Sequence, residues 1–128
     1  MTRRYARSGS PFEASIGFSR GVREARLVAV SGTAPVWPDG SVEPGPAAQA
    51  RRCWEIALAA LEELGGGPAD VLRTRQYITS IDVADAVGAV HAEVFGEVRP
   101  ASTMVIVAGL LDPRWLVEVE LDALIGDG

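Results

Sequence analysis

A long amphipathic segment at residues 47–64 restricts the possible folds more than any other feature of the sequence. Its apolar residues recur every three or four positions, while its charged residues lie largely on the opposite side. The apolar positions are Ala50, Cys53, Trp54, Ala57, Leu58, Leu61 and Leu64. This spacing predicts a helix that packs on a core, and the three glycines at 65–67 predict its end. The rest of the chain must therefore supply a second layer for the apolar side of this helix.

Alternating segments predict that the second layer is a β-sheet. Residues 71–79 alternate between two sets of side chains, as in a strand, with Arg73 and Arg75 in the same set. Further strands are predicted at 5–6, 16–22, 27–32, 102–107 and 116–124, with a hairpin turn at 23–26. The apolar runs MVIVAGLL and LVEVEL predict that one sheet face packs under the helices. We expect the other face to pack against neighbouring subunits, because it would otherwise be a large exposed apolar patch.

A second helix is predicted to begin after Asp82, its N-cap, and to end at Gly96. Its apolar stripe consists of Val83, Val87, Val90 and Val94. The resulting order is β-β-β-α-β-α-β-β, without repeats or linkers. We therefore expect one α+β domain that spans residues 1–128, with two helices and a sheet. A domain of this size leaves much apolar surface, which favours association of subunits.

The types of basic and metal-binding residues in the sequence exclude several kinds of enzyme chemistry. All twelve basic residues are arginines, so no lysine is present to form a Schiff base or a phosphate-binding loop. A pyridoxal phosphate enzyme is therefore not expected. His91 and Cys53 are the only histidine and cysteine, which is too few for an ordinary zinc site. We predict no metal and no cofactor.

Charge and apolar runs bear on partners and location. The formal net charge is −5, and the arginines are scattered, so we expect no nucleic-acid surface. The longest apolar runs are shorter than the roughly 20 residues of a membrane-spanning helix. The N-terminal arginines are not followed by an apolar stretch, so we expect no export signal. These observations predict a cytoplasmic protein without a membrane span.

Five blocks of the sequence carry a resemblance to a known family. They are VSGTAP, AAQARRCWEIALAALEELG, DVLRTRQYIT, HAEVFGEVRPAS and LVEVELDAL. In these blocks, and in their order and spacing, the chain resembles the reactive intermediate deaminase family, RidA or YjgF-like. The resemblance implies a fold like that of bacillus chorismate mutase, with a mixed sheet backed by two helices and closed into a trimeric barrel. It also implies a homotrimer that binds a small metabolite in a cleft between each pair of subunits.

The resemblance implies an activity, and the sequence departs from it at the site. Active members hydrolyse enamines and imines such as 2-aminoacrylate to a 2-keto acid and ammonia. They hold the substrate carboxylate with an arginine in a Pro-Ala-Arg-Ser/Thr-Thr sequence, where this chain has Pro100, Ala101 and Ser102. Phe18 stands in place of the usual tyrosine and Gly88 in place of an asparagine. The chain therefore resembles a divergent branch that lacks the usual carboxylate-binding arginine.

The resemblance places candidate site residues in this chain, each with an alternative role. Glu118 matches the glutamate that positions water, although it shares a strand face with Glu120, as two solvated acids would. His91 stands where the family often has tyrosine; it is a candidate acid or base near neutral pH, or a packed helix residue. These two are the predicted catalytic residues. The predicted substrate-binding residues are Phe18, Gly32, Arg99, Ser102 and Thr103.

Other charged residues have open assignments. Arg73 and Arg75 either pair with acids across the trimer or face an anionic ligand. Glu13 and Arg20 flank the first hairpin, where an ion pair at the mouth of the site is one possibility. Cys53, on the apolar side of the long helix, is predicted to be a core residue.

Four functions remain open at this stage. The first is an imine or enamine hydrolase whose substrate lacks, or places differently, its carboxylate. The second is a non-catalytic trimer that binds a small metabolite as a sensor or partner protein. A third, pericyclic chemistry like that of chorismate mutase, rests on fold analogy alone. The fourth, ribonuclease activity or translation inhibition, is attached to the family by name, and the acidic composition weighs against it.

Overall fold

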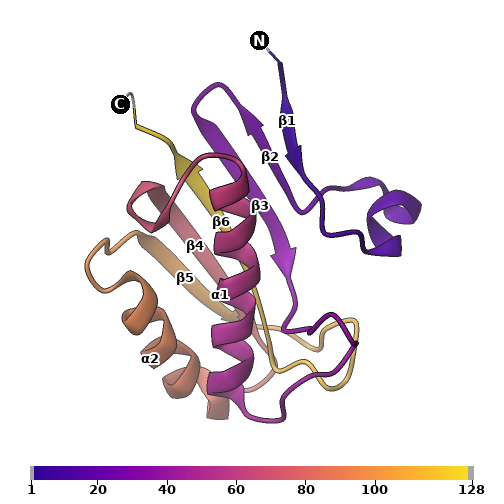
Figure 1. Ribbon diagram of the computed structural model, residues 1–128. Coiled ribbons are helices and arrows are strands. Elements are labelled where there is room, and N and C mark those ends of the chain that lie inside the picture. The colour runs from indigo at the N-terminus through magenta and orange to yellow at the C-terminus, as the bar shows by residue number, and fades with distance from the viewer. Residues whose placement is uncertain (1, 127–128) are drawn as a thin grey trace.

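The computed structural model describes residues 2–126 and consists of one six-stranded sheet with two helices (Figure 1). The strands are β1 (Arg4–Ala6), β2 (Gly21–Glu24), β3 (Leu27–Thr33), β4 (Val71–Ile78), β5 (Ala101–Ile106) and β6 (Val117–Leu124). The helices are α1 (Pro46–Glu63) and α2 (Ala84–Phe95), and the short turns are η1 (Glu13–Gly17), η2 (Pro68–Asp70) and η3 (Ile81–Val83). This is the mixed α+β architecture that the sequence predicts.

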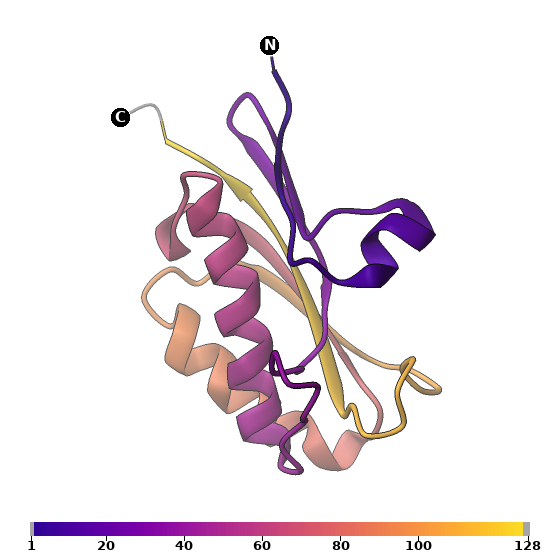
Figure 2. The same cartoon turned by 45° about the vertical axis from the view of Figure 1, so that its right-hand side comes forward.

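The strand order in the sheet is β1-β2-β3-β6-β4-β5. Only β4 and β5 pair in parallel, and α2 connects them; the other pairs are antiparallel. Both helices lie on the same side of the sheet (Figure 2). Within residues 2–126, no helix or strand covers the other face.

The core lies between α1, α2 and the covered face of the sheet. All the predicted apolar positions of α1 are buried except Leu58, which is partly buried. The Trp54 ring packs edge-on against Phe95, with 4.9 Å between ring centres. Cys53 is buried among these residues, and its burial raises the pKa of the thiol, so its predicted place in the core is confirmed.

Helix α1 ends as the glycines predict. Gly65 has a φ of +97°, which an L side chain rarely adopts. The Gly65 N–H donates to the Glu62 carbonyl at 2.9 Å, and the Gly66 N–H donates to the Leu61 carbonyl at 3.0 Å. These two bonds form a Schellman motif, which satisfies carbonyl groups that the last turn would leave unpaired.

The strand predicted at residues 16–22 is wrong in its first half. The chain forms the π-helical turn η1 up to Gly17, and β2 begins only at Gly21. Glu13 is buried in this region, and its carboxylate accepts hydrogen bonds from the backbone N–H and the hydroxyl of Ser8. The Phe18 N–H donates to the Glu13 carbonyl at 2.9 Å. These local bonds fold the segment back on itself, which a strand would prevent.

The predicted cap of the second helix is also wrong. Ser80, not Asp82, supplies the capping oxygen, which accepts a hydrogen bond from the Asp82 N–H at 3.1 Å. This cap begins the short turn η3, and α2 itself starts at Ala84. Serine and aspartate are equally good caps, so the sequence alone could not decide between them.

The uncovered sheet face carries charge where the sequence predicts apolar packing. The alternation of β6 turns its valines toward the helices and Glu118, Glu120 and Asp122 toward the uncovered face. Arg75 on β4 pairs with Glu120 at 3.6 Å and with Asp122 at 3.3 Å. Exposed apolar residues on this face include Leu27, Val105 and Leu124. The centre of this face is therefore a network of ion pairs. Arg75 forms its ion pairs with acids of its own chain.

The β2–β3 hairpin contains a strained residue that predicts a stabilising substitution. Ala25, the first residue of the two-residue turn, has a φ of 55°, which glycine adopts without steric cost. We expect Ala25→Gly to raise the free energy of unfolding by about 1 kcal/mol. Urea unfolding at equilibrium measures the difference.

The matched control is the same substitution at exposed Ala59 in α1. Glycine in a helix interior costs about 1 kcal/mol, so Ala59→Gly should change stability in the opposite direction. Equal losses at both positions would contradict the turn argument.

Candidate functional site

One group of candidate residues gathers where β3 meets β6. Phe18, Arg20, Gly32 and Glu118 form this group, which we call the Glu118 cluster. Gly32 lies so close to Glu118 that a Cβ atom on it would be 3.0 Å from the carboxylate Oε2. Arg20 Nη1 donates to the Gly32 carbonyl at 2.6 Å, and its guanidinium carbon lies 5.5 Å from the centre of the Phe18 ring. The pairing of β3 with β6 shifts register beside Gly32, which lets the carboxylate approach the backbone.

Burial changes the acid–base properties of this cluster. Burial raises the pKa of Glu118, and the positive charge of Arg20 opposes part of that rise. Burial also lowers the pKa of Arg20, while Glu13 and Glu118 act in the opposite sense. A carboxyl group with a raised pKa holds a proton closer to neutral pH than a surface acid does. Glu118 is therefore suited to exchange protons with a bound molecule.

A second group of polar residues gathers where α2 packs on β4 and β5. Thr74, Gln76, His91 and Ser102 form this group, which we call the Ser102 cluster. Thr74 Oγ1 lies 2.8 Å from His91 Nε2 and 2.7 Å from Ser102 Oγ. Gln76 Nε2 donates to Ser102 Oγ at 3.3 Å. The His91 ring also packs on Phe95, with 4.8 Å between centres, and burial lowers its pKa.

The two clusters lie on opposite faces of the sheet. Buried Thr74 and Gln76 alternate with Arg75 on β4 and face the helices. Glu118 belongs to the carboxylate set of β6, on the uncovered face. A single chain therefore does not bring His91 and Glu118, the two predicted catalytic residues, into one cleft.

The two remaining binding candidates lie outside both clusters. Thr103 pairs in register with Arg75, so it faces the uncovered side, opposite to Ser102. Arg99 is exposed in the loop before β5, with a φ of 53°. Among residues 2–126, no hydrogen bond joins Arg99 to a member of either cluster.

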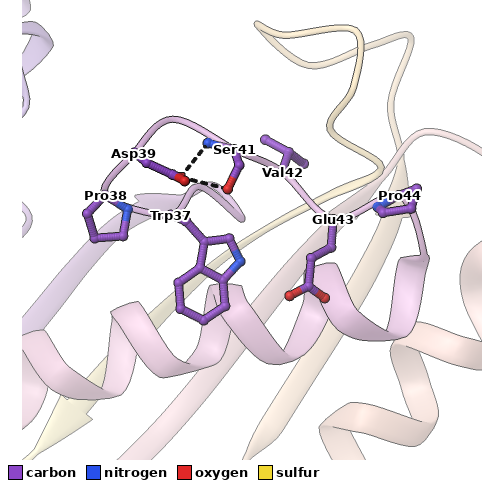
Figure 3. Close-up of a pocket in the computed structure, with 7 residues that line it drawn as sticks. All are labelled: Trp37, Pro38, Asp39, Ser41, Val42, Glu43 and Pro44. Atoms are coloured by element: carbon purple, nitrogen blue, oxygen red, sulfur yellow. Dashed lines mark hydrogen bonds between the residues drawn. The ribbon is translucent and has the colours of Figure 1, made fainter.

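Two surface hollows among residues 2–126 lie away from most of these candidates. One of about 570 Å³ is lined by residues of the loop that follows β3, and Asp39 folds back onto Ser41 there (Figure 3). It contains none of the predicted site residues. A smaller hollow of about 270 Å³ lies between the N-terminal segment and α1, and only Arg20 connects it with the Glu118 cluster. These two hollows therefore do not define the candidate site, which rests on its side-chain contacts.

Comparisons with known proteins agree on one family. Residues 9–125 match the family model described as Endoribonuclease L-PSP. A crystal structure of a YjgF/YER057c/UK114 family member from Mycobacterium tuberculosis is 42% identical, with a TM-score of 0.89, over 97% of this chain and 100% of that one. An uncharacterized protein of Streptomyces coelicolor is 40% identical, over 96% of this chain and 92% of its own length. A RutC family protein of Pyrococcus abyssi is 30% identical over 84% of each chain.

The chain belongs to the YjgF/RidA family. The resemblance seen in the sequence is thus confirmed, and so is the RidA fold of the single chain. The E. coli YjgF protein has the same fold, with a TM-score of 0.81 at 27% identity, over 94% of this chain and 93% of its own.

Sequence reasoning missed three members of the two clusters in this RidA-family chain. For Arg20 it offered only an ion pair with Glu13 at the mouth of the site as one possibility. Within the described residues no ion pair joins the two; Glu13 instead bonds Ser8, and Arg20 donates to the Gly32 carbonyl. It did not single out Thr74 and Gln76. Their signal was present, because polar residues on the helix-facing side of a strand need buried partners.

Two further findings concern metals and membranes. Residues 2–126 contain no group of three or more His, Cys, Asp or Glu side chains placed to hold a metal ion. In the same range, no helix has both the length and the apolar character needed to cross a bilayer.

Replacing Glu118 with glutamine tests the buried carboxyl group. The raised pKa of Glu118 means that the folded protein binds this proton more tightly than the unfolded chain does. The resulting stabilisation is complete below the pKa of the unfolded carboxyl and is lost as pH rises through the folded pKa. We expect Glu118→Gln to gain stability relative to the unsubstituted protein as pH is raised from 4 to 7.

Urea unfolding midpoints at several pH values provide the measurement. Glu97→Gln, which removes one carboxylate at an exposed position, is the control. A Glu118→Gln variant that loses stability relative to the unsubstituted protein as pH rises would contradict the assigned environment.

Proposed function

We propose that the protein is a homotrimer in which the Glu118 cluster of one subunit faces the Ser102 cluster of the next. The observation that carries this proposal is the separation of the clusters on opposite faces of one sheet. Each cluster is half a site, and a second subunit completes it in a closed ring. The cleft so formed takes a small metabolite, without metal, cofactor or nucleic acid, and the protein acts in the cytoplasm.

In the proposed reaction the cleft hydrolyses an imine, or an enamine after its tautomerisation to the imine, which moves a proton from nitrogen to carbon. Glu118 removes a proton from water as the water oxygen attacks the carbon of the C=N bond, and that proton moves to the nitrogen. The C–N bond of the resulting carbinolamine then breaks, its hydroxyl proton passes through Glu118 to the leaving nitrogen, and ammonia and a carbonyl compound remain. His91 and Ser102 orient the substrate from the other side.

The substrate of this cleft differs from that of arginine-bearing relatives. Ser102 cannot supply the charge-assisted, bidentate contact that an arginine makes with a carboxylate. Phe18 likewise lacks the hydroxyl of the tyrosine that it replaces. We therefore propose a substrate that lacks a carboxylate at this position, or that places it elsewhere, for example near Arg99.

The same two replacements favour a second candidate function, a non-catalytic trimer that binds a small metabolite. Ammonia release from a panel of imines generated in situ separates the two. A hydrolase should exceed the uncatalysed rate on at least one imine and lose that excess in Glu118→Gln. Binding of a carbonyl compound with no hydrolysis of any imine would favour the sensor or partner protein.

Assembly provides an independent prediction. Light scattering at micromolar concentration should report a mass close to three times the 13.5 kDa of the chain. The mass should hold on moderate dilution, because the half-sites and the exposed Leu27, Val105 and Leu124 would lie between subunits. A persistent monomer would refute both the trimer and the shared cleft.

A further inference from the structure

The hydroxyl of Ser102 is held by two donors from the neighbouring strand. Thr74 donates to Ser102 Oγ at 2.7 Å, and Gln76 Nε2 donates to it at 3.3 Å. A serine hydroxyl has two acceptor lone pairs and one proton. Both lone pairs are therefore occupied inside the protein, and the Ser102 O–H proton remains for another partner.

The proton order of the cluster follows from Thr74. Where Thr74 directs its single proton to Ser102, the 2.8 Å contact between Thr74 Oγ1 and His91 Nε2 is a hydrogen bond only if the imidazole donates. A neutral His91 with its proton on Nε2 satisfies this contact, and His91 Nε2 then cannot accept the Ser102 proton across 3.4 Å. In this order the hydrogen bonds run from His91 to Thr74 to Ser102 and end at the hydroxyl of Ser102, which is an exposed residue.

The orientation of Gln76 supports the same order. Its Oε1 atom is buried and has no partner within the described residues. The reverse amide orientation would put an NH₂ group, with two donors, in that position. One unpaired acceptor costs less than two unpaired donors, so the orientation that donates to Ser102 is favoured.

The Ser102 cluster carries no formal charge. Its members are two hydroxyls, an amide and an imidazole, and no acid of residues 2–126 forms an ion pair with His91. Burial lowers the pKa of the imidazole, which favours its neutral form. A ligand carboxylate bound at this cluster would lose its hydration without forming an ion pair, which is unfavourable. An uncharged oxygen would gain a hydrogen bond at little cost.

We propose that Thr74 and Gln76 are specificity-determining residues, which fix Ser102 as a hydrogen-bond donor, so that this half-site binds an uncharged acceptor such as a carboxamide or ketone oxygen. The proposal rests on the cleft of the proposed function. It goes further in naming the ligand group that replaces the carboxylate and two residues that select it.

The ligand-free protein provides the first test. His91 is the only histidine, so its ring nitrogens are identified without assignment by mutation in a ¹H–¹⁵N spectrum. We expect the neutral tautomer with the proton on Nε2 at pH 7.5. A proton on Nδ1 instead would mean that Thr74 donates to His91 and that Ser102 presents a lone pair, which would overturn the proposal.

Two matched probes provide the second test. Pyruvamide and pyruvate are nearly equal in size. Pyruvamide carries an uncharged amide where pyruvate carries a carboxylate. Followed through the His91 ring signals, pyruvamide should bind at least tenfold more tightly than pyruvate. Tighter binding of pyruvate would overturn the inference and leave the cleft in place. Failure of both probes to bind would refute the proposed small-carbonyl cleft, and the inference with it.

Variants connect this preference to the two residues. Thr74→Val keeps the shape of a buried side chain and removes its hydroxyl, so the preference for pyruvamide should fall at least threefold. Thr79→Val, just beyond the end of β4, is the control. Ser102→Arg should invert the preference toward pyruvate. An unchanged preference in Thr74→Val, with the trimer mass retained, would overturn the role of Thr74.

Discussion

Ser102→Arg should increase ammonia release from 2-aminoacrylate by about 30-fold or more. A desolvated arginine–carboxylate contact contributes on the order of 2 kcal/mol, which corresponds to about a 30-fold change. Ser102 lies on the edge strand β5 and is exposed, so a longer side chain fits without disturbing the core. The unsubstituted protein should show weak or no activity on this substrate. The measurement is the rate of ammonia release from 2-aminoacrylate generated in situ.

Two control variants separate charge from geometry. Ser102→Lys restores a positive charge without the planar pair of donors, so its gain should be smaller. Ser102→Gln adds length without charge and should give no gain. No gain with arginine would mean that the rest of the cleft has diverged as well. A rate in the unsubstituted protein comparable with that of an arginine-bearing relative would sink the prediction.

Trp54→Ala should cause a large loss of stability, whereas Trp54→Phe should cause a small one. Trp54 is 1% exposed and packs on Phe95 and His91, so truncation leaves a cavity in the centre of the core. Such truncations cost about 3–5 kcal/mol. The indole N–H of Trp54 is buried without a partner within the described residues. Phenylalanine removes that unpaired donor and keeps most of the ring, so its net cost should be about 1 kcal/mol or less.

Urea unfolding of both variants measures this contrast. Trp37→Ala is the control, because this ring covers Arg52 at the surface, 4.0 Å from the guanidinium, and its loss should cost about 1 kcal/mol. Equal losses in Trp54→Phe and Trp54→Ala would contradict the claim that the indole N–H of Trp54 is unpaired in the folded protein.

Local patterns predict the helices and central strands of this chain well. The spacing of apolar residues predicts helix α1, and the glycines after it predict where the helix ends. The structure agrees with both predictions. The strand predicted before β2 is wrong because local bonds, including those of the buried Glu13 carboxylate, hold this segment in a turn. Alternation alone gives no sign of such a contact. The same holds for the choice of Ser80 over Asp82 as a cap.

The candidate site was predicted only in part. The family resemblance identified Glu118, Gly32 and Ser102, which the structure places in two clusters. It did not reveal that a sheet separates them, because strand faces depend on pairing register and not on sequence distance. Thr74 and Gln76 were not predicted as site residues for a related reason. Their partners are more than ten residues away in the sequence and meet them only in the folded chain.

The placement of the two clusters on opposite faces of the sheet also bears on how this protein can change over evolutionary time. Substitutions around Ser102 alter side chains that point toward α2, while Glu118 and Gly32 keep their mutual contact across β3 and β6. A lineage can therefore exchange one recognised chemical group for another without rebuilding the buried acid. A serine at the position where the family resemblance expects an arginine, beside an unaltered carboxyl group on β6, is a change that such a separation permits.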